Sequence, residues 1–200
     1  MSQSTQSMAA AFFIIGPAGS GKSCLAEALV SRLHGAYVDK DIICNGFTGE
    51  LLKSHGYDSS ERDGNAYYLS ELMSIEYKTL LKVGTSNMQL GTPAVFDAPF
   101  GAYFKNDDFI NRVREKYRWP DEVDAVVVHV AVDGDTVRKR LITRGLQRDS
   151  WKLEHWNEFW SKTSGTKCQW KGALHVTVDN NIADKDYTAD INSILHRTGH

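Results

Sequence analysis

Short apolar runs recur along the chain and predict buried β-strands. A strand that is covered on both faces of a parallel sheet is almost continuously apolar, and four runs have this character: residues 11–15, 36–38, 94–96 and 125–132. A fifth run, residues 173–178, alternates apolar and polar positions, which predicts a strand nearer the edge of the sheet.

Segments with helical periodicity separate these strands. Leu25, Leu29 and Leu33 recur on one face of residues 22–33. Ser60 is a potential cap for a long helix reaching about Leu81, on which four apolar positions recur: Tyr68, Leu72, Ile75 and Leu80. Further helices are expected at residues 106–117, 135–144 and 185–196. The alternation predicts an α/β three-layer sandwich around a mostly parallel five-stranded sheet.

The composition fits one globular domain. The 200 residues are 42% hydrophobic and 24% charged, which allows a substantial core. We expect residues 1–10 to be a disordered lead and residues 11–200 to form a single domain. The early apolar run of residues 8–15 is too short to span a membrane. The three cysteines are widely spaced, which favours a reducing cytoplasm over a disulfide framework or a zinc site.

Charge argues against a nucleic-acid partner. The net charge is −2, and lysines and arginines are dispersed rather than clustered into a basic block. The seven histidines show no pairing typical of a transition-metal site. The sequence does not indicate an oligomeric state.

The strongest motif is a phosphate-binding loop (P-loop) at residues 16–23. The sequence Gly16-Pro17-Ala18-Gly19-Ser20-Gly21-Lys22-Ser23 matches G-x-x-x-x-G-K-[ST] between a predicted strand and a predicted helix. Glycines let successive N–H groups converge on phosphate oxygens, and the helix N-terminus adds partial positive charge. Lys22 is expected to reach the β- and γ-phosphates of ATP, and the Ser23 hydroxyl to bind Mg²⁺. The residues expected to bind ATP are Gly16, Ala18, Gly19, Ser20, Gly21, Lys22, Ser23 and Cys24.

Two aspartates follow the second predicted strand. If the segment stays extended, Asp39 and Asp41 point to the same side at the carboxyl end of a parallel strand, where ligands of open α/β sheets bind. One carboxylate is then suited to hold Mg²⁺ through water and the other to accept the proton of an attacking hydroxyl. The alternative is that both residues serve as turn and helix-capping residues.

The P-loop and this aspartate pair together resemble the P-loop small-molecule kinases. The resemblance is to predicted AAA-type kinases and to gluconate kinase, shikimate kinase, chloramphenicol phosphotransferase and the kinase part of polynucleotide kinase. It implies a P-loop NTPase fold in which Asp41 contacts the acceptor hydroxyl as the base and Asp39 lies near the metal.

Three further residues are candidates around the acceptor. Asp97 ends the third predicted strand and is suited to Mg²⁺ or to a turn, so Asp39 and Asp97 both remain candidates for the main metal-side carboxylate. Phe100 follows Pro99 in a turn over the expected cleft. Arg62 lies where such kinases often place an acceptor-binding arginine, although an exposed helix-start charge is the alternative.

Arginines spaced by four predict a lid at about residues 144–165. Arg144 and Arg148 match the arginines that close over ATP in the kinases named above, and Gly145 is a potential hinge. Arg138 and Arg140 are expected on a solvated helix face. An aromatic cluster is expected to pack the lid helix onto the core: Trp151, Trp156, Phe159 and Trp160.

The sequence thus predicts an ATP- and Mg²⁺-dependent transfer of the γ-phosphoryl group to a hydroxyl of a small metabolite or antibiotic. Lys22, Asp41, Arg144 and Arg148 are the candidate catalytic residues. Neither a nucleic acid nor a membrane is expected as a partner. The alternatives are a nucleotide or polynucleotide 5′-kinase and a switch protein that hydrolyses ATP without transfer.

Overall fold

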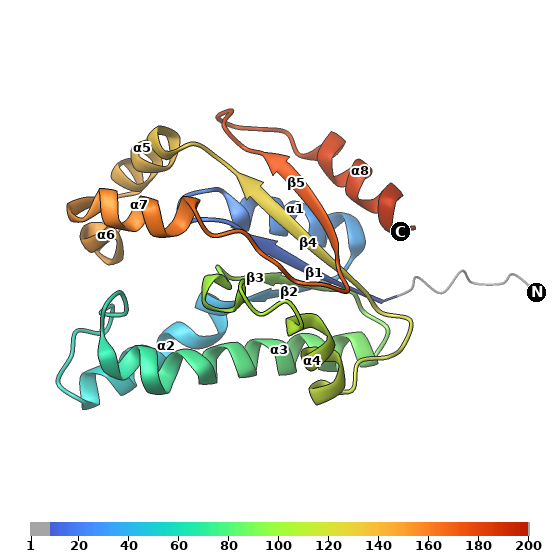
Figure 1. The fold of residues 1–200 in the computed structure, drawn as a ribbon, viewed down its shortest axis with the longest axis horizontal. Coiled ribbons are helices and arrows are strands. Elements are labelled where there is room, and N and C mark those ends of the chain that lie inside the picture. Colours follow the sequence, from blue (N-terminus) through green and yellow to red (C-terminus); the bar gives the residue numbers. More distant parts are fainter. Residues whose placement is uncertain (1–8, 200) are drawn as a thin grey trace, which may run out of the picture.

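The computed structural model describes residues 9–199 and contains an all-parallel sheet with helices on both faces (Figure 1). The strands are β1 (Ala10–Ile15), β2 (Ala36–Asp39), β3 (Ala94–Asp97), β4 (Asp124–Ala131) and β5 (Leu174–Asp179). The helices are α1 (Lys22–Leu33), α2 (Lys40–Ser54), α3 (Met73–Gln89), α4 (Phe109–Tyr117), α5 (Gly134–Arg144), α6 (Ser150–Glu154), α7 (Trp156–Ser164) and α8 (Thr188–Thr198).

The strand order is β2-β3-β1-β4-β5, which confirms the five predicted strands and the parallel sheet. Every pairing within this sheet is parallel. β5 is an edge strand, as its alternating pattern predicted. β1 begins at Ala10, and Ala9 and Ala10 are buried, so the domain starts slightly before residue 11. The rest of the predicted N-terminal lead lies outside the described residues.

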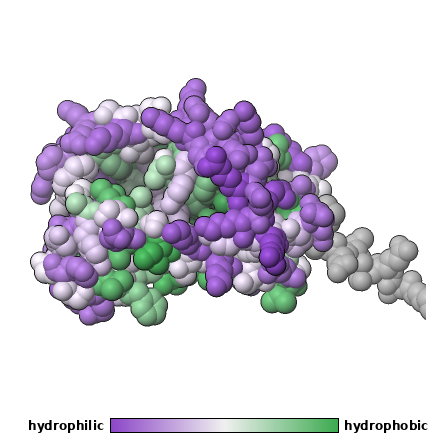
Figure 2. Space-filling view, turned by 60° about the horizontal axis from the view of Figure 1, so that its bottom comes forward, coloured by the Kyte–Doolittle hydropathy of each residue, from purple (hydrophilic) through white to green (hydrophobic). Residues whose placement is uncertain are grey.

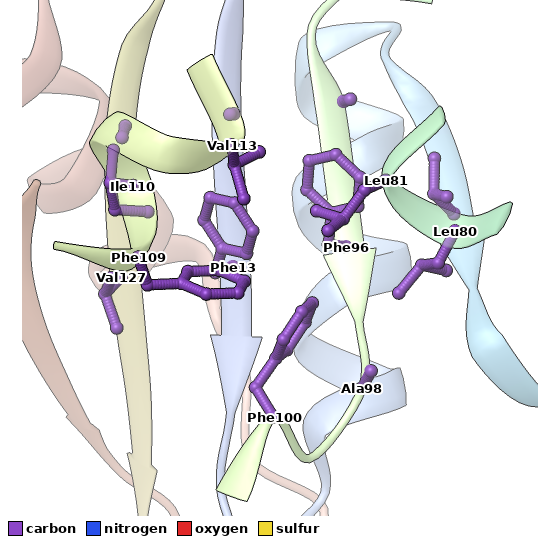
Figure 3. Packing of buried hydrophobic residues seen from close by; sticks show 14 of the residues in the cluster. Phe13, Leu80, Leu81, Phe96, Ala98, Phe100, Phe109, Ile110, Val113 and Val127 are labelled. Atoms are coloured by element: carbon purple, nitrogen blue, oxygen red, sulfur yellow. The ribbon is translucent and has the colours of Figure 1, made fainter. Parts of the chain in front are cut away.

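Both faces of the sheet are buried, which explains why its strands are almost continuously apolar. Successive side chains of β1 point to opposite faces. Phe13 lies on the face covered by α3 and α4, and its ring stacks on Phe96 with centroids 4.8 Å apart (Figure 3). Phe12 and Ile14 lie on the opposite face against Leu25 and Leu29 of α1. Each such fully buried side chain contributes about 1.5–3 kcal/mol to folding.

The helix predicted at residues 60–81 begins later and ends later in the structure. Asp58 holds Ser60, accepting hydrogen bonds from its backbone N–H (2.8 Å) and its hydroxyl (2.6 Å), so Ser60 caps no helix. Asn65 instead accepts the backbone N–H of Tyr68 at 2.8 Å, three residues on. A π-helical turn, Tyr68–Leu72, then leads into α3.

The carboxyl ends of the strands are covered by the segment that includes α5, α6 and α7. In Figure 1 these helices lie on the side towards which the strand arrows point, opposite the loop between α2 and α3. α5 ends at Arg144 and is capped by Gly145, which has a positive φ of 59° and separates Arg144 from the short turn carrying Arg148. Arg144 and Arg148 therefore lie on two separate helical segments rather than on one continuous helix.

The surface is largely hydrophilic with scattered apolar side chains. Figure 2 brings the side of the molecule with α2 and α3 forward, and apolar groups lie among polar ones there. The most exposed apolar side chains of α2 are Ile42 and Phe47. Within residues 9–199, no helix is both long and apolar enough to cross a membrane.

Candidate functional site

A cavity of about 770 Å³ lies at the carboxyl ends of the strands and contains most of the predicted site residues. Its lining includes Ala18, Gly19, Gly21, Lys22, Ser23, Cys24, Asp39, Asp41, Arg62, Asp97, Arg144 and Arg148. Eight lysines and arginines but only five aspartates line it, a formal charge of +3 in a chain whose net charge is −2. A positive cavity in an acidic chain favours an anionic ligand.

The P-loop connects β1 to α1 in a curled conformation that needs its glycines. At Gly16, an added Cβ would lie 2.9 Å from both the Ser20 hydroxyl and the Val130 carbonyl oxygen. Gly21 has a φ of 89°, and a Cβ there would lie 2.3 Å from the Asn180 amide nitrogen. Lys22 Nζ donates to the Pro17 carbonyl at 2.9 Å. The loop is therefore closely packed behind while its front faces the cavity.

Two side chains from other parts of the chain hold the backbone of the loop through hydrogen bonds. Asn180 follows β5, is buried, and donates to the Ser20 carbonyl at 2.6 Å. Arg140 of α5 donates to the carbonyls of Asn180 (2.9 Å), Ile182 (3.3 Å) and Ser20 (3.4 Å). The prediction of a solvated face is therefore wrong for Arg140, because backbone carbonyls around the P-loop accept its guanidinium hydrogens.

Asp39 and Asp97 lie side by side at the ends of β2 and β3, where they are register partners. The Tyr37 hydroxyl lies between them, 3.2 Å from Asp39 Oδ2 and 3.1 Å from Asp97 Oδ2. Burial and the two carboxylates raise the pKa of Tyr37, so it stays a hydrogen-bond donor. Burial also raises the pKa of Asp97, although Lys22 opposes this shift. These oxygens and the Ser23 hydroxyl form a set of hard donors suited to Mg²⁺.

Asp39 and Asp41 both line the cavity, but not through an extended segment. β2 ends at Asp39, whose carboxylate caps α2 by accepting the Ile42 N–H at 2.7 Å. Asp41 lies in the first turn of α2. The extended geometry was therefore wrong, because the cap starts a helix at Lys40, and the capping alternative holds for Asp39.

Two cations hold the Asp41 carboxylate. Lys40 Nζ lies 3.2 Å from Oδ1, and Arg148 Nη1 donates to Oδ2 at 2.6 Å. Burial works to raise the pKa of Asp41, but Lys40 and Arg148 outweigh it and lower the pKa below its usual range. Asp41 is therefore ionised at neutral pH.

Behind Asp41 lies a buried network centred on Glu76 of α3, which is 3% exposed. Glu76 accepts hydrogen bonds from Lys40 (3.0 Å), the Thr48 hydroxyl (2.6 Å) and the Tyr68 hydroxyl (2.7 Å). Burial opposes its ionisation, but Lys40 and the two hydroxyl donors lower the pKa of Glu76 on balance. The network joins α2, α3 and the π-helical turn beneath the cavity.

The predicted arginines Arg144 and Arg148 both line the cavity, but different residues hold them in place. Arg144 forms a two-pronged pair with Asp149, with Nε–Oδ2 at 2.6 Å and Nη2–Oδ1 at 2.8 Å. Asp149 is 1% exposed, so this pair fixes the Arg144 guanidinium firmly. Trp156 stacks on Trp160, whose ring lies against Gly134 of α5. This part of the aromatic cluster packs α7 onto α5 rather than onto the core, because none of its residues belongs to the buried core clusters of residues 9–199. Trp151 and Phe159 line the cavity.

The opposite wall carries Arg62 but not Phe100. Arg62 lies over the Tyr68 ring, and its Nε is buried without a hydrogen-bond partner among the described residues. Phe100 is fully buried and packs edge-on against Phe13 with ring centroids 5.4 Å apart (Figure 3). Its predicted place in the acceptor pocket is therefore wrong, because the turn points its ring into the core. The neighbouring Pro99 and Gly101 line the cavity instead.

The residues present fit a nucleoside triphosphate and a divalent cation. The glycines allow the curled loop that directs backbone N–H groups at phosphates, and α1 starts directly after them. Among residues 9–199 there is no cluster of three or more His, Cys, Asp and Glu residues that could hold a metal by itself. A site built from Ser23 and one or two aspartates suits Mg²⁺, which retains several waters and binds substrate phosphates.

Several residues of the site were not predicted from the sequence. Tyr37 could have been found from its spacing of two from Asp39, which puts both on one face of β2. No sequence motif points to the other three: Lys40, Glu76 and Lys152. The pairs that place them in the site join residues far apart in sequence.

Comparison with known proteins agrees with this fold. A scan against protein-family models matches residues 12–165 to a family described as an AAA domain. A search of curated protein sequences finds no match.

Solved structures of kinases share the fold at low sequence identity. A candidate kinase from Chloroflexus aurantiacus is 14% identical with a TM-score of 0.66, and the alignment covers 96% of this chain and 97% of that one. Shikimate kinase from Bacteroides thetaiotaomicron is 14% identical with a TM-score of 0.55, covering 96% and 99%. The APS kinase of Mycobacterium tuberculosis, solved with AMPPNP and APS, is 13% identical with a TM-score of 0.56, covering 96% and 99%.

The family match spans the P-loop, the aspartate pair and the arginine-bearing segment, and the structural matches span nearly the whole chain. The protein has the fold of the P-loop kinases, and the chain belongs to the AAA domain family that its sequence matches.

Proposed function

We propose that this protein transfers the γ-phosphoryl group of ATP to a hydroxyl group of a small molecule. One observation carries the proposal: a carboxylate suited to act as a general base, a P-loop lysine and two arginines line the same cavity. They are Asp41, Lys22, Arg144 and Arg148. A protein that only hydrolyses ATP has no need of an acceptor-side carboxylate next to space for a second substrate.

Each residue has a part in this reaction. Bound MgATP would supply the phosphoryl group, with the P-loop holding its phosphates and Ser23, Asp39 and Asp97 available for the metal. Asp41 accepts the proton of the acceptor hydroxyl as the new O–P bond forms and the bond to ADP breaks. Lys22, Arg144 and Arg148 neutralise charge on the transferred group. The proton then leaves Asp41 to water.

The low pKa of Asp41 ensures that its base form is present at neutral pH, although it also lowers the basicity of the carboxylate. The carboxylate is ionised at neutral pH and can accept a proton without first losing one. Arg148 occupies one of its oxygens, so the acceptor hydroxyl has to share or displace this contact. Movement of Arg148 from Asp41 towards the phosphoryl group would bring a positive charge to the reacting atoms.

The acceptor side of the cavity favours a compact molecule. Its wall combines Arg62 with Leu69, Met73 and Trp151, which suits a ring or apolar body with a hydrogen-bond acceptor for the arginine. The related enzymes support this size class, because one of the structural matches is a shikimate kinase and another a sugar kinase.

A competition experiment tests the acceptor class. Labelled ATP is offered with 5′-hydroxyl oligonucleotides and with small alcohols, at low and moderate salt. We expect label in a small alcohol and little in the oligonucleotides. Efficient oligonucleotide labelling that weakens steeply with salt would support a polynucleotide kinase instead.

Cys24 provides a test of the nucleotide site that needs no acceptor. It is exposed in the first turn of α1, beside Ser23, whereas Cys168 is half-buried elsewhere. MgATP should slow alkylation of Cys24 and leave Cys168 unchanged, as peptide mass spectrometry can measure. Equal rates at Cys24 with and without MgATP would contradict the nucleotide assignment.

A further inference from the structure

An ion pair crosses the cavity from the lid segment to the wall that carries Arg62. Lys152 of α6 points its ammonium at Asp63, with Nζ 2.5 Å from Oδ2. The two residues are 89 positions apart in sequence, and both line the cavity. Lys152 is 13% exposed and Asp63 43% exposed, so water reaches the pair from one side.

The same ammonium supports the residues around both candidate catalytic arginines. It donates to the Arg148 carbonyl at 3.0 Å and lies 3.7 Å from Asp149 Oδ1. Asp149 in turn holds Arg144 through two hydrogen bonds. Lys152 therefore connects the wall beside Arg62 to the backbone of Arg148 and to the carboxylate that orients Arg144.

Both ends of this connection have the features of a reversible contact. On one side, Gly145 ends α5 with a φ of 59° and has no atom within 4 Å of an added Cβ, so it can act as a hinge. On the other side, Asp63 precedes Gly64, which has a φ of 80°. A partly exposed ion pair is worth little in isolation, and thus can form and break within a catalytic cycle.

We propose that Asp63 and Lys152 form a latch that closes the lid on the acceptor wall, with Lys152 and Asp149 acting as positioning residues for Arg144 and Arg148. Its role in catalysis rests on the proposed phosphoryl transfer. When the latch is closed, the arginines face the cavity and water has less access to it. When it is open, they are released together with the segment after Gly145. Phosphoryl transfer thereby depends on contact between the lid segment and the acceptor wall.

The latch itself can be tested without knowing the acceptor. Hydrogen exchange of the amides in residues 147–154 is measured in the full chain for the wild type, Asp63→Asn and Asp63→Glu. We expect exchange about five-fold faster in Asp63→Asn, since a neutral amide cannot replace the charge, and near wild-type exchange in Asp63→Glu. High salt should accelerate exchange in the wild type more than in Asp63→Asn.

Asp107→Asn is the matched control. It removes another aspartate–lysine pair between separate segments, that with Lys171 at 2.6 Å, but neither residue lines the cavity. This variant should leave exchange in residues 147–154 unchanged. Wild-type exchange in Asp63→Asn, or equal acceleration in Asp107→Asn, would overturn the latch.

The catalytic role is tested separately in a transfer assay. Asp63→Asn should lower kcat several-fold with ATP affinity unchanged, and Asp63→Glu should restore kcat. If exchange changes as expected but kcat does not, the latch exists without positioning the arginines, and the positioning role is overturned. If no transfer occurs in the wild type, the proposed function fails while the exchange result still decides the latch.

Discussion

At the scale of single residues, the account depends most on Asp41. Asp41→Asn keeps the shape of the side chain but removes its basicity, so kcat should fall by about 10²- to 10⁴-fold. ATP affinity should change little, because the acceptor side of the cavity is affected and the P-loop is not. Steady-state kinetics and calorimetric titration with ATP measure the two effects. Weak ATP binding with normal transfer at saturation would assign Asp41 to the metal or to the fold.

The pH dependence of kcat tests the same residue. A base works only when ionised, so its contribution is lost as the pH falls through its folded pKa. Because Lys40 and Arg148 hold the pKa of Asp41 below its usual range, no acidic decline due to Asp41 should appear above about pH 5. A decline centred between pH 6 and 7, at roughly the range of histidine, would indicate another group.

Arg148 and Arg144 require different substitutions because their supports differ. Arg148 is 37% exposed and pairs with the similarly exposed Asp41, so Arg148→Ala should fold normally. It should lower kcat by about 10³-fold through lost charge stabilisation. Arg144→Ala would leave the buried Asp149 without its main partner, and Arg144→Lys is therefore the better probe. Thermal denaturation controls for folding, and full activity in both variants would remove the arginines from the mechanism.

At the scale of elements, Glu76 stabilises the arrangement of α2, α3 and the π-helical turn. Glu76→Gln removes the buried partner of Lys40 and leaves only the partly exposed Asp41 as its counter-charge, which should cost about 3 kcal/mol of unfolding free energy at neutral pH. Urea denaturation measures this loss. Glu50→Gln is the control, because its pair with Lys53 is exposed to solvent and its loss should change the unfolding free energy far less.

The same variant has a predicted pH signature. The folded pKa of Glu76 lies below its ordinary value, so its contribution is complete above the ordinary pKa of about 4.3 and is lost as the pH falls through the folded value. The wild type should therefore lose more stability on acidification than Glu76→Gln. Parallel losses in both proteins would show that the carboxylate does not stabilise the fold through its charge.

At the scale of the whole molecule, the fold was predictable because its signals are local. A strand buried on both faces leaves a continuous apolar run, and the P-loop is one contiguous motif. Failures occurred where neighbours distant in sequence decide the outcome. Ser60 does not cap a helix, because its hydroxyl donates to the Asp58 carboxylate. Phe100 does not line the cavity, because its ring packs in the core against Phe13 and Trp170.

The site was predictable only in part for the same reason. Lys22, Asp41 and Arg148 could be identified because each lies in or near a motif. The groups that hold them in place could not, since Glu76 reaches Lys40 across 36 positions and Lys152 reaches Asp63 across 89. Side chains that position catalytic groups need only a contact, and a contact between distant residues leaves no pattern in a single sequence.

The most direct test of the account is transfer itself. The protein is incubated with γ-labelled ATP, Mg²⁺ and a panel of small hydroxyl compounds and antibiotics, and the products are identified by mass spectrometry. Lys22→Ala is the blank, because Lys22 contacts only the Pro17 carbonyl among the described hydrogen bonds and its loss should spare the fold. The account predicts a phosphorylated small molecule with the wild type and none with Lys22→Ala. Label that appears only as inorganic phosphate, at a rate unaffected by any compound, would contradict it and indicate an ATP-hydrolysing switch.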